Sequence, residues 1–190
     1  GSGHGPFGWG WNFGLPMISR KTDKGLPRYR ESDRDEEPDI FILSGAEDLV
    51  PVLELVGDAW QMPAPLWLSA DAAGRWVEVI DPADAQFAVT RYRPRTEGLF
   101  ARIERWTAVQ SGEIHWRTIA KDNVYSIYGA SSGARVADAQ RPGRVFSWLI
   151  EASFDDRGNA IRYDYATEDG RSVGLGDVSE AHRAAELAPG

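Results

Sequence analysis

The chain has 190 residues and a formal net charge of −8, with 42% hydrophobic and 26% charged residues, a globular composition of a length that suits one domain. The acidic balance disfavours general attraction to nucleic-acid phosphates or anionic lipid, which favour positive surfaces. The absence of cysteine excludes disulfides and thiolate chemistry, and no apolar run approaches the roughly 20 residues that cross a bilayer, so neither nucleic-acid binding nor membrane insertion is expected.

The N-terminal part of the chain changes character twice. Residues 1–14 alternate glycine with aromatic residues, which is typical of an extended backbone with one covered face. They lack the basic and apolar regions of a secretory signal, so we expect a native start upstream or export without a cleaved signal. Residues 18–38 are strongly charged and have no apolar period, which predicts a solvated loop or a long hairpin excursion.

Short apolar or alternating runs separated by turn residues follow from residue 39 onward. Residues 39–43 and 49–56 predict a buried hairpin, with Pro51 displacing its second strand toward an edge. Residues 67–69 and 75–80 predict another hairpin, joined by a turn in which Gly74 takes positive φ. The further runs of this kind lie at 86–93, 99–109 paired with 114–119, 123–128 paired with 134–137, and 145–154 paired with 160–165.

This pattern predicts an all-β fold made of an antiparallel, hairpin-rich sheet. The one helix that the sequence predicts is short and C-terminal, where Asp177 and Glu180 have capping-box spacing.

Two of the predicted turns share one spacing, with aspartate followed by glycine three residues later, at Asp71 and at Asp155. The second lies in FDDRGNAIRYDY, which resembles a repeat unit of the Rhs or YD type. Aspartate accepts backbone N–H groups in such a turn, and Tyr163 and Tyr165 would place rings on one sheet face. The alternative is that Asp155 and Asp156 form a carboxylate pair for acid–base work or for a hard cation, which is disfavoured because adjacent side chains diverge.

Arginine and aromatic residues between 91 and 106 have the look of a nucleic-acid-binding stripe. Because Glu97 and Glu104 are interspersed among them, we favour cross-strand ion pairing on a solvated face. The residues concerned are Arg91, Arg93, Arg95, Arg102 and Arg105 with Tyr92, Phe100 and Trp106.

Catalytic and metal-binding motifs are missing from the sequence. The three histidines are far apart, and no Walker A loop, H-E-x-x-H pair or strand–G-x-G-x-x-G–helix unit occurs. The string GASSG at residues 129–133 matches G-x-S-x-G, but no predicted helix follows it, so it is not a nucleophile elbow. We therefore expect no catalytic site, no metal site and no cofactor. The eight tryptophans could line a carbohydrate groove, but core fillers and interface anchors are the favoured interpretation.

Four strings together resemble the N-terminal domain of SpvB-like proteins and of the B components of bacterial Tc toxins. They are GPFGWGWNFGLPMISRKTDKGLPRY, DIFILSGAEDLVPV, RYRPRTEGLFARIERW and RVFSWLIEASFDDRGNAIRYDY. The resemblance covers residues 1–165, whereas residues 166–190 match loosely. We expect residues 1–190 to form a single partial domain, an internal piece of a longer one.

The resemblance implies a segment of a hollow β shell, built with Rhs-type repeats and a propeller, that encloses a cytotoxic polypeptide. Its partners would be other shell segments of the parent chain, the Tc C-component cargo and the A-component channel, in a toxin secreted from the bacterial cytoplasm. SpvB-like proteins carry an ADP-ribosyltransferase as a separate C-terminal domain, and this chain lacks its Glu-x-Glu pair, so we expect no enzyme. The function implied is noncatalytic enclosure or delivery of a toxic effector.

The alternative function is an aromatic-rich module that binds a glycan or a receptor, with Trp9 and Trp67 as candidate contacts. The residues expected to have structural or interface roles are Trp9, Trp11, Trp148, Asp155, Gly158, Asn159, Tyr163 and Tyr165.

Overall fold

The computed structural model describes residues 14–23, 25–29, 39–44, 48–96 and 101–166, and the backbone of two short strands, β1 (His4–Gly5) and β2 (Gly8–Trp9). The fold is all-β and antiparallel, as the sequence predicts. Within the described part, the helical structure consists of two 3-10 turns, η1 (Pro82–Asp84) and η2 (Ser132–Ala134). None of the described segments forms a helix long and apolar enough to cross a membrane. The helix predicted near Asp177 lies outside the described residues.

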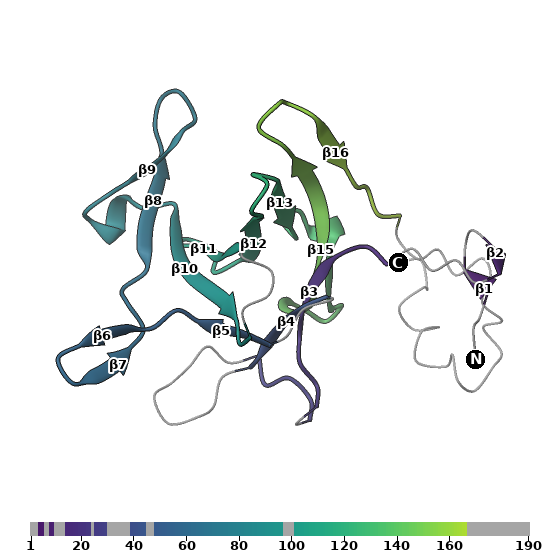
Figure 1. The fold of residues 1–190 in the computed structure, drawn as a ribbon, viewed down its shortest axis with the longest axis horizontal. Helices are drawn as coiled ribbons and strands as arrows, with labels where there is room; N and C mark the ends of the chain where they lie inside the picture. Colours follow the sequence, from purple (N-terminus) through teal and green to yellow (C-terminus); the bar gives the residue numbers. More distant parts are fainter. Residues whose placement is uncertain are drawn as a thin grey trace.

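Eight strands close into an antiparallel barrel (Figure 1). Their order around the barrel is β11-β12-β13-β15-β3-β4-β5-β10, and β10 pairs with β11 to complete the circuit. The barrel strands are β3 (Met17–Arg20), β4 (Phe41–Leu43), β5 (Asp48–Pro51), β10 (Phe87–Pro94), β11 (Arg102–Ala108), β12 (Ile114–Ile119), β13 (Tyr125–Tyr128) and β15 (Arg141–Phe154).

Additional strands extend the barrel outward. β8 (Leu66–Ala70) pairs with the first half of β10, and β9 (Trp76–Glu78) pairs with β8. β14 (Arg135–Asp138) and β16 (Ala160–Arg162) pair with the two ends of β15. β6 (Glu54–Val56) and β7 (Ala59–Gln61) form a separate two-stranded sheet. Figure 1 shows this hairpin and the β8–β9 hairpin projecting from the same side of the barrel.

The barrel interior is filled by side chains rather than left open, as expected at eight strands. Trp116 and Trp148 are fully buried there, with ring centroids 6.0 Å apart, and Phe41 packs edge-on against both at 4.9 and 5.8 Å. The core residues are Ile18, Phe41, Leu43, Leu49, Tyr92, Ile103, Trp116, Tyr128, Val145, Trp148 and Ile150.

The pairing of the long strand β15 with its neighbours contains three register shifts. Its register skips Phe146 and then residues 142–144 against β14, and Glu151 against β13. A bulge adds one residue to a strand and increases its local twist. The first bulge breaks the strict alternation of faces, so that Val145 and Trp148, three residues apart, both reach the core.

Most of the predicted hairpins are confirmed, namely β4–β5, β8–β9, β11–β12 and β15–β16. β10 and β11 also pair antiparallel, which the sequence does not predict. Gly74 has a φ of +75°, as its turn requires. The prediction for residues 49–56 is wrong in two respects. The run is split between β5 and β6, and Pro51 does not make β5 an edge strand, because β5 lies between β4 and β10 with Pro51 at its last position.

Two further predictions are corrected. The runs 123–128 and 134–137 do not pair with each other, since β13 and β14 both pair with β15, at different parts of its length. The charged segment does not begin its loop at residue 18, because β3 extends to Arg20 and the Ile18 side chain is fully buried. The segment does connect the antiparallel pair β3 and β4, so the hairpin interpretation is confirmed.

Candidate functional site

Trp148 lies inside the barrel, where its indole Nε1 donates a 2.8 Å hydrogen bond to the carbonyl of Ile114. Tyr163 packs against the core cluster, and the hydroxyl of Tyr165 donates to the carbonyl of Ile150 at 2.6 Å. The described contacts of these three predicted residues are therefore made within this chain. The side chain of Trp9 and all of Trp11 lie outside the described residues.

The turn at Asp155 uses its carboxylate to fix the backbone. One oxygen accepts the N–H groups of Arg157 and Asn159, and the other accepts the Asn159 side-chain amide at 2.7 Å. These bonds, the Asn159 amide first, lower the pKa of Asp155. Gly158 has a φ of +87°, which the turn requires of a glycine. The carboxylate is thus engaged in the turn rather than paired with Asp156 for catalysis.

The turn at Asp71 is built in the same way, as the shared spacing predicts. Asp71 accepts the N–H groups of Ala73 and Arg75, and the Arg75 guanidinium takes the place of the Asn159 amide. Here too the backbone and side chain of Arg75 lower the pKa of the aspartate.

An aromatic cluster covers the outer face of β10, β11 and β12. It consists of Trp76, Phe87, Trp106 and His115, which meet at centroid distances of 5.2 to 5.7 Å. The guanidinium of Arg117 lies 3.6 Å above the Trp106 ring, a favourable position for a cation on an aromatic face. Because side chains alternate along a strand, Trp106 faces outward while Ile103 faces the barrel core.

Glu104 is buried beneath this outer aromatic cluster, so the prediction that it lies on a solvated face is wrong. One carboxylate oxygen accepts the Trp106 indole N–H at 3.0 Å, and the other pairs with Arg102. The hydrogen-bonded ion pair is therefore within strand β11, and a cross-strand charge attraction also links Glu104 to Arg117, which lies opposite it on β12. Glu97 and Phe100 lie outside the described residues.

His115 is held neutral within the outer aromatic cluster. Its pKa is lowered from 6.5 to about 3, chiefly by burial and then by the charges of Arg117 and Arg135. Its Nε2 accepts a hydrogen bond from Arg117 Nε at 3.2 Å, which only the neutral ring can do.

This neutral histidine predicts a pH-dependent loss of stability. The pKa is lower in the folded state, so below pH 6.5 the unfolded chain binds more protons and stability falls as the pH falls. Between pH 7 and pH 5 this group should reduce the free energy of unfolding by about 2 kcal/mol. The His115→Gln variant should lose that dependence in denaturant titrations at both pH values. Asp71 and Asp155 change stability only at more acidic pH, near and below their ordinary pKa of 3.8, so they do not contribute to this pH dependence. An equal loss of stability between pH 7 and pH 5 in the variant and the wild type would contradict the role given to His115.

A pocket of about 520 Å³ opens beside Trp148, between the β11–β12 turn and the β14–β15 hairpin. Its charged groups are engaged with their neighbours. Arg135 donates to the carbonyls of Gly129 and Ala130 and pairs with Glu113 at 3.2 Å. Arg20 donates to the carbonyl of Val145 and to the Asp39 carboxylate, both at 2.8 Å.

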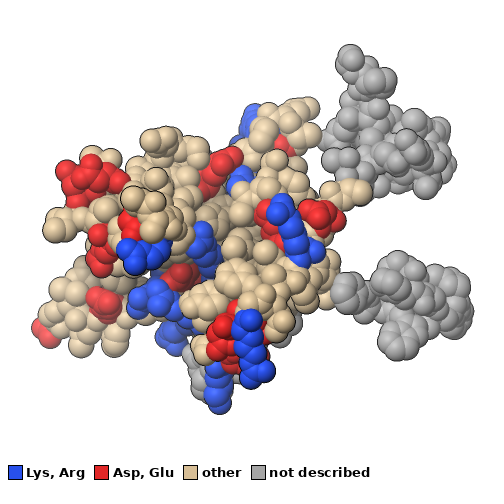
Figure 2. Space-filling view, turned by 90° about the horizontal axis from the view of Figure 1, so that it is seen from above, with Lys and Arg blue, Asp and Glu red and all other residues tan. Residues whose placement is uncertain are grey.

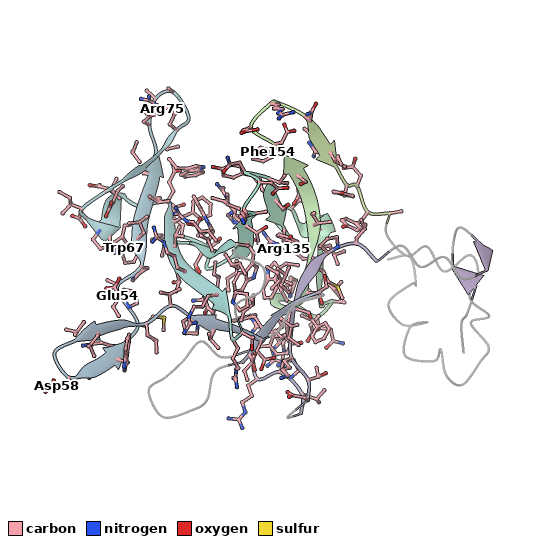
Figure 3. All side chains as sticks on the ribbon, viewed as in Figure 1. Glu54, Asp58, Trp67, Arg75, Arg135 and Phe154 are labelled. Carbon is pink, nitrogen blue, oxygen red and sulfur yellow. The ribbon has the colours of Figure 1, made fainter. Side chains whose placement is uncertain are left out.

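The guanidinium groups at this pocket hold neighbouring backbone carbonyls, and Figure 3 labels Arg135 near the centre of the view. The described residues contain no group of three or more histidine, aspartate or glutamate side chains that would hold a metal ion.

These observations define the fold class as an all-β protein built on a closed antiparallel barrel with a filled interior. The chain belongs to the SpvB family, described as Salmonella virulence plasmid 65kDa B protein, which it matches over residues 1–188. The predicted family is confirmed, and the match continues past residue 165.

Among its relatives are the mono(ADP-ribosyl)transferases SpvB of Salmonella typhimurium and Salmonella dublin, each 35% identical over 175 residues. The match covers 92% of this chain but only 27% of theirs. The solved N-terminal domain of SpvB from Salmonella typhimurium LT2 is 32% identical with a TM-score of 0.71, over 94% of this chain and 50% of that one. The chain therefore corresponds to part of the SpvB N-terminal region.

The barrel also occurs within much larger toxin complexes. The TcdB2-TccC3-Cdc42 structure is 29% identical with a TM-score of 0.70, covering 97% of this chain and 8% of that one. The Photorhabdus luminescens Tc holotoxin pore is 29% identical with a TM-score of 0.68, covering all of this chain and 8% of that one.

Proposed function

We propose that this chain is a noncatalytic structural module of a secreted bacterial toxin and that it helps to enclose or deliver a cytotoxic effector. The observation that carries the proposal is the similarity of nearly the whole chain to one segment of the TcdB2-TccC3 assembly. The side chains that fill the barrel support it, because a wall segment needs a rigid sheet. Its partners would be further shell segments of the same polypeptide, the toxic cargo and the channel component.

We propose that the chain has no enzymatic activity of its own. The SpvB relatives are named as mono(ADP-ribosyl)transferases, but the chain spans 27% of their length. The carboxylates Asp71, Glu104 and Asp155 are engaged in turns or beneath the outer aromatic cluster, which supports structural roles. Incubation of the purified chain with actin and labelled NAD should give no transfer, and any turnover would contradict this.

Enclosure is tested in the full-length protein that contains this chain. Limited proteolysis should leave the effector region intact in the wild type. The Gly129→Ala variant, which should destabilise the barrel, is expected to expose that region to cleavage. Gly74→Ala serves as a matched glycine control and should keep the protection. Equal cleavage of the effector in the wild type and both variants would contradict the proposal.

A glycan-binding or receptor-binding module is the second candidate, and exposed tryptophan favours it. Trp60 is 67% exposed, and Trp67 is half-buried on β8. A glycan array that shows saturable binding, lost in Trp67→Ala or Trp9→Ala, would support this function. If no glycan binds saturably, the array counts against glycan binding and in favour of the enclosure function.

A further inference from the structure

Two hairpins, β6–β7 and β8–β9, project from the same side of the barrel (Figure 1), and large apolar side chains on and beside them are exposed. On β6–β7, Trp60 and Leu55 are 67% and 57% exposed, and after β9 Ile80 is fully exposed. We call this surface the double-hairpin face. It comprises Leu53, Leu55, Val56, Trp60 and Met62 on and beside β6–β7, and Val77 and Ile80 on and beside β9. Exposed apolar patches on a protein surface often mark an interface.

The β6–β7 hairpin has little to hold it in place within this chain. All six of its strand residues are exposed, and it pairs with no other strand among those described. Leu55 and Trp60 lie directly opposite each other in the register. An isolated two-stranded hairpin is only marginally stable in water. A regular hairpin with exposed apolar side chains therefore indicates that another surface packs against it.

The double-hairpin face is also acidic. Residues 52–86 contain six carboxylates and a single basic residue, Arg75, which is paired with Asp71. Figure 3 shows Glu54 and Asp58 on the β6–β7 hairpin, and Figure 2 shows acidic groups gathered at that end of the molecule. The carboxylates are Glu54, Asp58, Asp71, Glu78, Asp81 and Asp84.

The strand β9 adds an open sheet edge to this surface. It pairs with β8 on one side and with no described strand on the other. Its three residues, Trp76 to Glu78, are all exposed. An edge strand with unpaired backbone groups is a template for another strand.

We infer that the double-hairpin face docks onto a surface with Lys or Arg around an apolar centre, supplied by another part of the same polypeptide. Charge complementarity requires a basic partner, since interface potentials oppose each other in sign. The docking partner belongs to the same polypeptide, because a hairpin that no neighbouring strand stabilises needs a partner that is always present. The chain also matches only half of the solved SpvB N-terminal domain, which leaves as much again to provide it. This inference rests on the proposed structural role.

Cysteine labelling in the full-length protein tests the docking. The chain itself has no cysteine, so Leu55→Cys introduces a defined site, and Ile161→Cys on β16 is a control of matched exposure, 58% against 57%. Maleimide labelling at each site is followed by mass spectrometry in native buffer and in urea. The Leu55→Cys site should label at least tenfold more slowly in the native state, whereas Ile161→Cys should change less than threefold.

The charge requirement is tested with a second pair of variants. In the Leu55→Cys background, replacing Glu54 and Asp58 by lysine should remove most of the protection, whereas Asp156→Lys in the β15–β16 turn should leave it. Protection should also weaken as salt concentration rises. Protection that is unaffected by the charge reversal would overturn the basic partner.

Other outcomes also decide against the proposal. Fast native labelling of Leu55→Cys would overturn intramolecular docking. Protection that increases with protein concentration would assign the face to a second copy of the chain instead. If the Leu55→Cys site is protected but the effector region is cleaved by protease, the docking is supported and enclosure is contradicted. If the site labels fast but the effector region is protected, enclosure is supported and the docking is contradicted.

Discussion

Replacing Trp148 with alanine is expected to lower the free energy of unfolding by about 4 kcal/mol, the cost of emptying a fully buried aromatic site. The Trp148 ring contacts Trp116 and Phe41 inside the barrel, and the Arg20 guanidinium lies 5.4 Å from its centroid. Its loss also leaves the Ile114 carbonyl without its indole donor. The neighbouring rings are packed on several strands, so they cannot collapse into the space.

Urea denaturation followed by tryptophan fluorescence and circular dichroism measures this loss. Trp60→Ala is the matched control, because the same side chain is removed from a site that is 67% exposed. Its effect in the isolated chain should be within about 0.5 kcal/mol of zero, as for most surface substitutions. Similar losses for the two variants would show that Trp148 does not support the core.

The sequence predicts the local hairpins well because each depends on a turn and two adjacent alternating runs. The closure of the barrel depends on pairings between distant segments, such as Trp148 with Ile18. Alternation identifies a strand but not its partner. For the same reason the sequence predicts a hairpin between β13 and β14, whereas in the structure both strands pair with the long strand β15.

In the candidate site, too, the sequence predicts the local features but not those that bring distant strands together. The turn at Asp155 is predictable, since Asp155, Gly158 and Asn159 lie within five residues and act on their own backbone. The outer aromatic cluster was missed because its rings come from four strands, β9 to β12. One signal was present in the sequence: Trp106 and Glu104 share a strand face, and a carboxylate beside a tryptophan can accept its indole N–H.

Gly129→Ala is expected to lower the free energy of unfolding by about 3 kcal/mol. Gly129 has a φ of +64°, where a side chain costs about 1 kcal/mol, and overpacking a core adds about 2 kcal/mol. An added Cβ would lie 2.4 Å from Cδ1 of Trp148. The backbone cannot retreat easily, because the Gly129 N–H donates to Leu149 and its carbonyl accepts from Arg135. Gly74→Ala, at φ +75° with nothing within 4 Å, should cost only the backbone part.

A double-mutant cycle separates the collision from the backbone strain. If the added methyl collides with the indole, Gly129→Ala should cost only about 1 kcal/mol in the Trp148→Ala background, giving a coupling of about 2 kcal/mol. The two chemical denaturation series are measured under the same conditions. An equal cost of Gly129→Ala in both backgrounds would mean that positive φ alone requires the glycine. A coupling would instead show that the close approach of Gly129 to Trp148 is what places this tryptophan in the barrel.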